Sequence, residues 1–145
     1  MHRLVAAAIV ALALAFAAPV ATAQDRVGPV KVVYHVSEGN AQAMNALRNI
    51  GNHLTADPTA KIVVVTHAGG VNFLLDGATD SNGAPFEAVV QQLTAKGVEF
   101  RVCRFTLERN KIDPKKVLPE ATIVPSGVAE VSKLQFKEGF AYLRP

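Results

Sequence analysis

The chain has 145 residues, half of them hydrophobic, and its 15 lysines and arginines exceed its 12 aspartates and glutamates by a formal charge of +3. The basic residues of the C-terminal half alternate with acidic ones, which is typical of a solvated surface and gives no reason to expect a nucleic-acid partner. The single cysteine, Cys103, excludes an internal disulfide.

The first residues have the pattern of a secretory signal peptide. Arg3 is followed by an apolar run from Leu4 to Ala18 and by the small residues Ala21-Thr22-Ala23. The apolar run is shorter than the roughly 20 residues that a membrane span needs. We therefore predict cleavage after Ala23, a periplasmic or secreted protein, and no membrane attachment of the mature chain, with an uncleaved anchor as the alternative. Residues 24–145 then have the size of one domain.

The first half of the mature chain alternates between strand and helix patterns. The β-branched run over residues 30–36 predicts a strand, and apolar residues at helical spacing over 41–54 predict a helix that ends at Asp57-Pro58. Residues 61–66 form a second predicted strand, whose continuous apolar character indicates burial on both faces. The segment His67-Ala68-Gly69-Gly70 then leads into a short helical turn over residues 71–75.

The second half continues the same alternation. Apolar residues at helical spacing over 86–93, with Gly97 suited to the C-terminal cap, predict the next helix. Strands are predicted over 98–103, 121–124 and 140–143, and a helix after Pro125-Ser126-Gly127. Strands that alternate with helices favour an α/β fold with a mainly parallel sheet covered on both faces.

A parallel sheet brings the C-terminal end of every strand, and the loop that follows it, to one edge. Open α/β sheets bind their ligands at this edge. The candidate site residues that this topology delivers there are His35, His67, Gly69, Gly70, Cys103, Arg104, Thr106 and Ser126.

Cys103 has two interpretations on residue chemistry alone. Arg104 adjoins it, Arg101 lies two residues before it, and a turn or helix begins directly after it, so the local sequence favours a thiolate. Free cysteine is nevertheless most often a small buried hydrophobic residue. The single cysteine of an exported chain has three possible roles: a buried residue without a function, one half of an intermolecular disulfide, or a reactive thiol.

The other candidate ligands give weaker signals. His35 and His67 could in principle bind zinc or copper together with Cys103, but the three come singly from separate elements and no HExxH or CxxC motif is present, so no metal is predicted. Each histidine is expected to be a hydrogen-bonded residue at a strand end. Gly69 and Gly70 could present backbone N–H groups to an anion, or form a bare turn; no GxGxxG, P-loop or GxSxG motif occurs.

Five segments together carry a resemblance to a known family. In chain order they are VKVVYHVSEG, LRNIGNHL, KIVVVTHAGGVNFLL, GVEFRVCRFTL and IVPSGVAEVSKLQFKEGFAYLRP. Their order and spacing resemble the DsrE/DsrF-like sulfur-relay family, especially its small exported members, over essentially the whole mature chain. The resemblance implies a three-layer α/β/α sandwich with a five-stranded parallel sheet, assembled as a homotrimer or hexamer and without a cofactor.

The resemblance also implies a chemistry. In sulfur-relay members a cysteine accepts sulfane sulfur as a persulfide and passes it on, and Cys103 and Thr106 match the Cys-x-x-Thr turn of exported relatives. The first hypothesis is a periplasmic sulfur carrier or sulfurtransferase that works with a sulfur donor or acceptor protein. Cys103 would then be the nucleophile, Arg101 and Arg104 would favour its thiolate, and His67 would transfer a proton or orient the thiol. The alternative is a non-catalytic oligomeric module that binds a small anion or peptide at the strand ends, with Cys103 silent.

Overall fold

The computed structural model describes residues 28–145, so the predicted signal peptide lies outside the described residues. Five strands form one sheet of order β4-β3-β2-β1-β5, in which every neighbouring pair is parallel. The predicted strands are confirmed, and each observed strand begins within one residue of its predicted start. The strands are β1 (Lys31–Val36), β2 (Lys61–Thr66), β3 (Glu99–Cys103), β4 (Ala121–Val124) and β5 (Ala141–Leu143).

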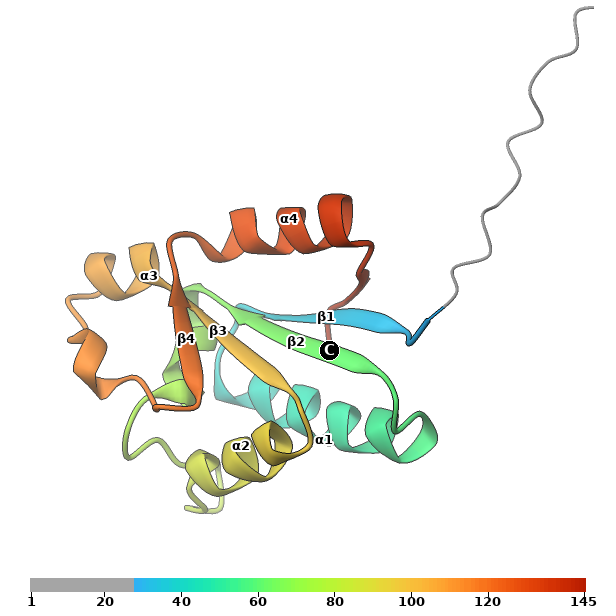
Figure 1. Cartoon of the computed structure of the whole chain (residues 1–145). Helices are drawn as coiled ribbons and strands as arrows, with labels where there is room; N and C mark the ends of the chain where they lie inside the picture. The colour runs from blue at the N-terminus through green and yellow to red at the C-terminus, as the bar shows by residue number, and fades with distance from the viewer. Residues whose placement is uncertain (1–27) are drawn as a thin grey trace, which may run out of the picture.

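The helices form layers on both faces of this sheet. Helices α1 (Asn40–Ala56) and α2 (Phe86–Ala95) lie on one face, and α4 (Gly127–Glu138) crosses the other (Figure 1). The expected three-layer α/β/α sandwich is therefore confirmed. A short helix, α3 (Arg104–Arg109), and a 3-10 turn, η2 (Pro114–Lys116), connect β3 to β4. No helix within residues 28–145 is long and apolar enough to cross a membrane.

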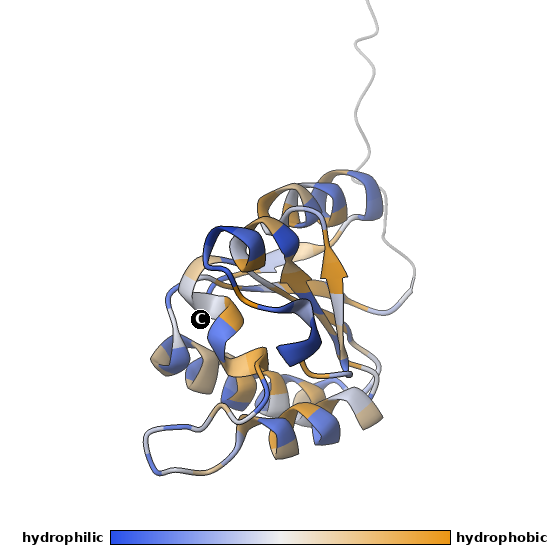
Figure 2. Ribbon diagram, turned by 90° about the vertical axis from the view of Figure 1, so that its left-hand side faces the viewer, coloured by the Kyte–Doolittle hydropathy of each residue, from blue (hydrophilic) through white to orange (hydrophobic). Residues whose placement is uncertain are grey.

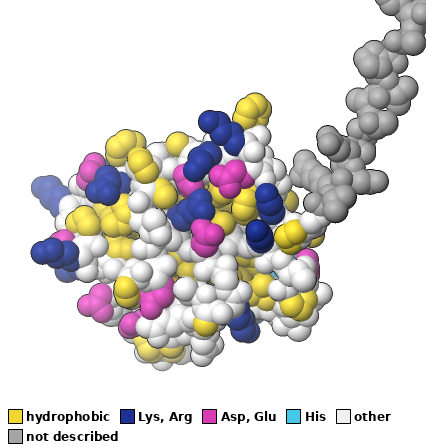
Figure 3. Space-filling model, viewed as in Figure 1, with side chains coloured by type: hydrophobic (Ala, Val, Ile, Leu, Met, Phe, Trp, Pro, Cys, Tyr) yellow, Lys and Arg dark blue, Asp and Glu magenta, His cyan; other side chains and the backbone are white. Residues whose placement is uncertain are grey.

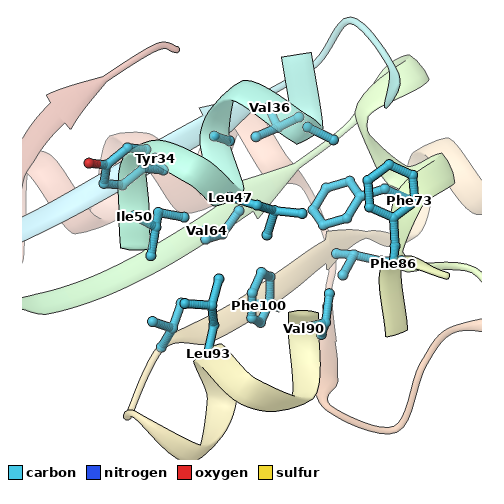
Figure 4. Close-up of a cluster of buried hydrophobic side chains, with 14 of the residues drawn as sticks. Tyr34, Val36, Leu47, Ile50, Val64, Phe73, Phe86, Val90, Leu93 and Phe100 are labelled. Atoms are coloured by element: carbon cyan, nitrogen blue, oxygen red, sulfur yellow. The ribbon is translucent and has the colours of Figure 1, made fainter. Parts of the chain in front are cut away.

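The two faces of the sheet bury unequal cores. Under α1 and α2, Phe73 contacts Phe86 and Phe100 edge to face, with ring centroids 5.7 and 6.3 Å apart, inside a large apolar cluster (Figure 4). The cluster under α4 is smaller and consists of Val33, Val63, Val65, Val131, Leu134 and Phe140. In Figure 2 the hydrophobic colour is concentrated in the strands, whereas the helices carry both hydrophobic and hydrophilic residues. Polar side chains also lie on the α4 side of the sheet, among them Arg101, which pairs with Glu130 of α4.

The loop after β2 differs from the prediction in one respect. A 3-10 helix, η1 (Ala68–Leu74), begins three residues before the predicted turn and therefore includes the glycine pair. A Cβ atom at Gly70 would lie only 2.1 Å from the Val36 carbonyl oxygen, and one at Gly69 would lie 2.7 Å from the Glu38 carbonyl oxygen. The two glycines therefore let η1 pack directly against the chain that leaves β1.

Candidate functional site

Cys103 is the last residue of β3 and the N-cap of α3, and its side chain is buried, with 5% of its surface exposed. The first residue of α4, Gly127, lies against it. A Cβ atom at Gly127 would lie 3.3 Å from the Cys103 Cβ and 3.1 Å from the His67 Cβ. The ends of β2 and β3 and the beginning of α4 therefore meet around the thiol, at the sheet edge where the sequence analysis expected them.

Hydrogen-bond donors surround the sulfur of Cys103. Burial by itself raises the pKa of the thiol, but the Thr106 hydroxyl and the backbone N–H groups of Gly127, Thr106 and Phe105 near the sulfur together lower the pKa below its ordinary value. The Thr106 oxygen also accepts a hydrogen bond of 3.0 Å from the Ala68 N–H, which leaves the hydroxyl proton for the sulfur. The site therefore favours the thiolate, the form of cysteine that reacts.

The two arginines near Cys103 in the sequence lie elsewhere in the structure. Arg101 pairs with Glu130 of α4 and, at 2.6 Å, with Glu99, so its charge links α4 to β3. Arg104 is exposed and has no ion pair among the described residues. Basic and acidic side chains are intermixed over the face shown in Figure 3. The lowered pKa of the thiol therefore arises from neutral hydrogen-bond donors, whereas the sequence analysis attributed it to these arginines.

Two histidines lie against one another on the α4 side of the sheet. The rings of His35 and His67 stack with centroids 4.8 Å apart, and His35 Nδ1 is hydrogen-bonded to the Tyr142 hydroxyl at 2.7 Å. Burial is the main cause that lowers the pKa of both imidazoles. The charge of His67 and then that of Arg144 lower the pKa of His35 further, and the charge of Arg144 lowers the pKa of His67 further. The neutral form of both rings is therefore favoured, and a neutral imidazole can accept a proton.

Tyr142 and Arg144 were missed by sequence reasoning. Tyr142 lies within the last predicted strand, Arg144 directly follows that strand, and neither belongs to a recognisable motif. Their contact with the histidines depends on the pairing of β5 beside β1. Among residues 28–145, no three side chains of histidine, cysteine, aspartate or glutamate are grouped so that they could hold a metal ion.

The remaining predicted site residues have structural contacts. Gly70 N–H donates to the His67 carbonyl at 2.9 Å, and the neighbouring Ala68 N–H is taken by Thr106. Ser126 is the N-cap of α4, and its hydroxyl oxygen accepts a hydrogen bond of 3.4 Å from the Ala129 N–H. In this structure these groups organise the loops around Cys103.

We expect the histidine pair to make the protein less stable in mild acid. Because both pKa values are lower in the folded chain than in the unfolded chain, the folded state binds fewer protons below about pH 6.5. The stability is therefore complete above that pH and is lost as the pH falls through the lowered pKa values. Urea unfolding at a series of pH values measures the effect. In the His35→Gln, His67→Gln double variant the free energy of unfolding should decline less steeply as the pH falls. An unchanged slope of that free energy against pH would contradict the histidine pair as the cause.

The model of the DsrE/DsrF-like family matches residues 31–145. The chain belongs to this family. A DsrE/DsrF-like assignment agrees with the resemblance seen in the sequence, and the match includes β3, Cys103 and the start of α4.

Two solved structures are similar to this DsrE/DsrF-like chain. MTH1491 from Methanobacterium thermoautotrophicum, described as a protein of unknown function, is 30% identical with a TM-score of 0.71, over 80% of this chain and 99% of its own. The ychN protein of E. coli is 14% identical with a TM-score of 0.67, over 80% of this chain and 99% of its own, and at this identity it supports the fold alone. No curated protein matches the chain.

Proposed function

We propose that this protein is a periplasmic sulfur carrier or sulfurtransferase that holds sulfane sulfur as a persulfide on Cys103. The observation that carries the proposal is the position of Cys103, which ends β3 and caps α3 beside the first residue of α4. There the Thr106 hydroxyl and three backbone N–H groups lower the pKa of its thiol. Membership of the DsrE/DsrF-like family supports it, because the family match spans this site.

The chemistry needs only the thiolate and the groups around it. The Cys103 thiolate attacks the terminal sulfur of a donor persulfide, so that a new S–S bond forms while the donor's S–S bond breaks and the donor leaves as a thiolate. An acceptor thiolate then attacks the same terminal sulfur and regenerates Cys103. The hydrogen-bond donors around the sulfur stabilise its negative charge before and after transfer, and neutral His67 accepts the thiol proton.

The surroundings of the thiol favour a protein as donor or acceptor. Phe105 lies on α3, two residues after Cys103, and Val128 lies on α4, directly after Gly127. The side chains of Phe105 and Val128 are each 57% exposed. Large exposed apolar side chains beside a reactive group are typical of a surface that another protein covers. We therefore infer that sulfur arrives on and leaves with a partner protein that contacts these two residues.

Mass spectrometry tests the proposal directly. We expect the mature chain beginning at Gln24, purified from the periplasmic fraction and treated with polysulfide, to gain about 32 Da, and to lose this mass on reduction. Cys103→Ser should abolish the gain and leave the fold intact.

The burial of Cys103 favours one other function, a non-catalytic module that binds a ligand at the strand ends. In that case the wild-type thiol would resist both polysulfide and a small alkylating reagent until the protein is unfolded. This result would contradict the sulfur-carrier proposal.

We further propose that the protein assembles as a homotrimer or hexamer. Phe136 on α4 is 91% exposed. An exposed phenylalanine of this kind is suited to burial against another copy. Sedimentation should give a closed assembly at micromolar concentration, and Phe136→Asp should shift it toward the monomer. A wild-type monomer over this range would contradict the proposal.

A further inference from the structure

A groove lies between α1 and α2 and does not include Cys103. These two helices cover the face of the sheet opposite α4 (Figure 1). The volume of the groove is about 420 Å³, within the range of about 300–1,000 Å³ that is common for small-molecule sites. The buried side chains of Leu47 and Phe86 line it, together with half-buried Met44 and Val89. The groove is therefore mainly apolar.

Two charged residues, Asp80 and Arg48, line the groove. Oδ1 of Asp80 accepts hydrogen bonds from the backbone N–H groups of Asn82 and Ala84, at 2.8 and 2.9 Å, so this carboxylate organises its own loop. Arg48 is exposed on α1 and donates one hydrogen bond, to Asn45 Oδ1 at 2.8 Å. It has no ion pair with any described carboxylate. The guanidinium is thus available to a ligand.

We propose that this groove binds a small amphiphilic carboxylate, with its hydrocarbon chain between α1 and α2 and its carboxylate on Arg48. The apolar lining matches the chain, and the fork of N–H groups on an arginine matches the two oxygens of a carboxylate. Charge complementarity therefore selects an anionic head group over a neutral or cationic one. The site is independent of the sulfur chemistry proposed for Cys103.

Met44 provides a direct probe of the groove. The chain has two methionines, and removal of the signal peptide with Met1 leaves Met44 alone, so its labelled methyl group gives a single NMR signal. We expect decanoate, below its micelle concentration, to shift this signal in a saturable way. Arg48→Gln should weaken decanoate binding about tenfold, because it removes a hydrogen bond to a charged group. Arg109→Gln, which changes an exposed arginine of α3, should leave the affinity unchanged.

Decanol has the same chain length without the charge and completes the test. It should bind about tenfold more weakly than decanoate to the wild type, and equally to the wild type and Arg48→Gln. Equal affinity for decanoate and decanol in the wild type would overturn the assignment. So would the absence of any shift of the Met44 signal, whether the groove is closed by another protein chain or too shallow to hold the ligand.

Discussion

Replacement of Gly70 by alanine is expected to destabilise the fold by about 3 kcal/mol or more. The added Cβ would lie 2.1 Å from the carbonyl oxygen of Val36, 2.4 Å from the carbonyl carbon of Val36 and 2.8 Å from the backbone nitrogen of Ser37. All three are backbone atoms, so no change of side-chain rotamer relieves the contact. Either η1 or the end of β1 must move, although both are buried. The midpoint of urea unfolding measures the loss.

Gly51 provides the matched control. It lies within α1, and a Cβ atom there would meet no heavy atom within 4 Å. Gly51→Ala should therefore stabilise the protein by about 0.5–1 kcal/mol, because alanine loses less backbone entropy in a helix. If both alanine variants were equally stable, close approach between η1 and β1 would not be the reason for a glycine at position 70.

Replacement of Thr106 by valine is expected to have the largest effect on the thiol short of removing the sulfur itself. The hydroxyl lowers the pKa of the Cys103 thiol and accepts a hydrogen bond from the Ala68 N–H, so valine removes both interactions. The pKa of Cys103 should rise, because burial still opposes the thiolate while one of its donors is lost. We expect alkylation at neutral pH to slow about tenfold, since a hydrogen bond to a charged group contributes about 1.5–3 kcal/mol.

The same substitution should lower the free energy of unfolding by about 1–3 kcal/mol, because it leaves the Ala68 N–H without its partner. Thr106→Ser keeps the hydroxyl and should restore both reactivity and most of the stability. Thr122→Val makes the same chemical change at an exposed position of β4 and should alter neither. The pH dependence of alkylation, followed together with the thiolate absorbance, measures the pKa. If the midpoint of the pH dependence of alkylation were unchanged in Thr106→Val, the Thr106 hydroxyl would not be a cause of the lowered pKa of Cys103.

The sequence by itself determined where the strands lie and that Cys103 ends one of them. Hydrophobic periodicity is a local property, and the continuous apolar run of residues 62–65 indicated correctly that β2 is covered on both sides. Residues Ile62 to Thr66 are all buried at the centre of the sheet. The order and spacing of five characteristic segments also predicted the family, because both can be read directly from the sequence. The family match over residues 31–145 confirms this prediction.

Only the tertiary structure decided which groups surround the thiol. The Gly127 N–H reaches Cys103 because α4 begins directly above the end of β3, and the Tyr142 hydroxyl reaches His35 because β5 pairs with β1. Arg101 is close to Cys103 in sequence, yet its neighbour in space is Glu130. Adjacent residues of a strand point to opposite faces, and residues two apart are separated by about 6–7 Å along the strand. Proximity in the chain therefore could not identify the groups that surround the sulfur. Those groups are determined by the order of the strands and the placement of the helices.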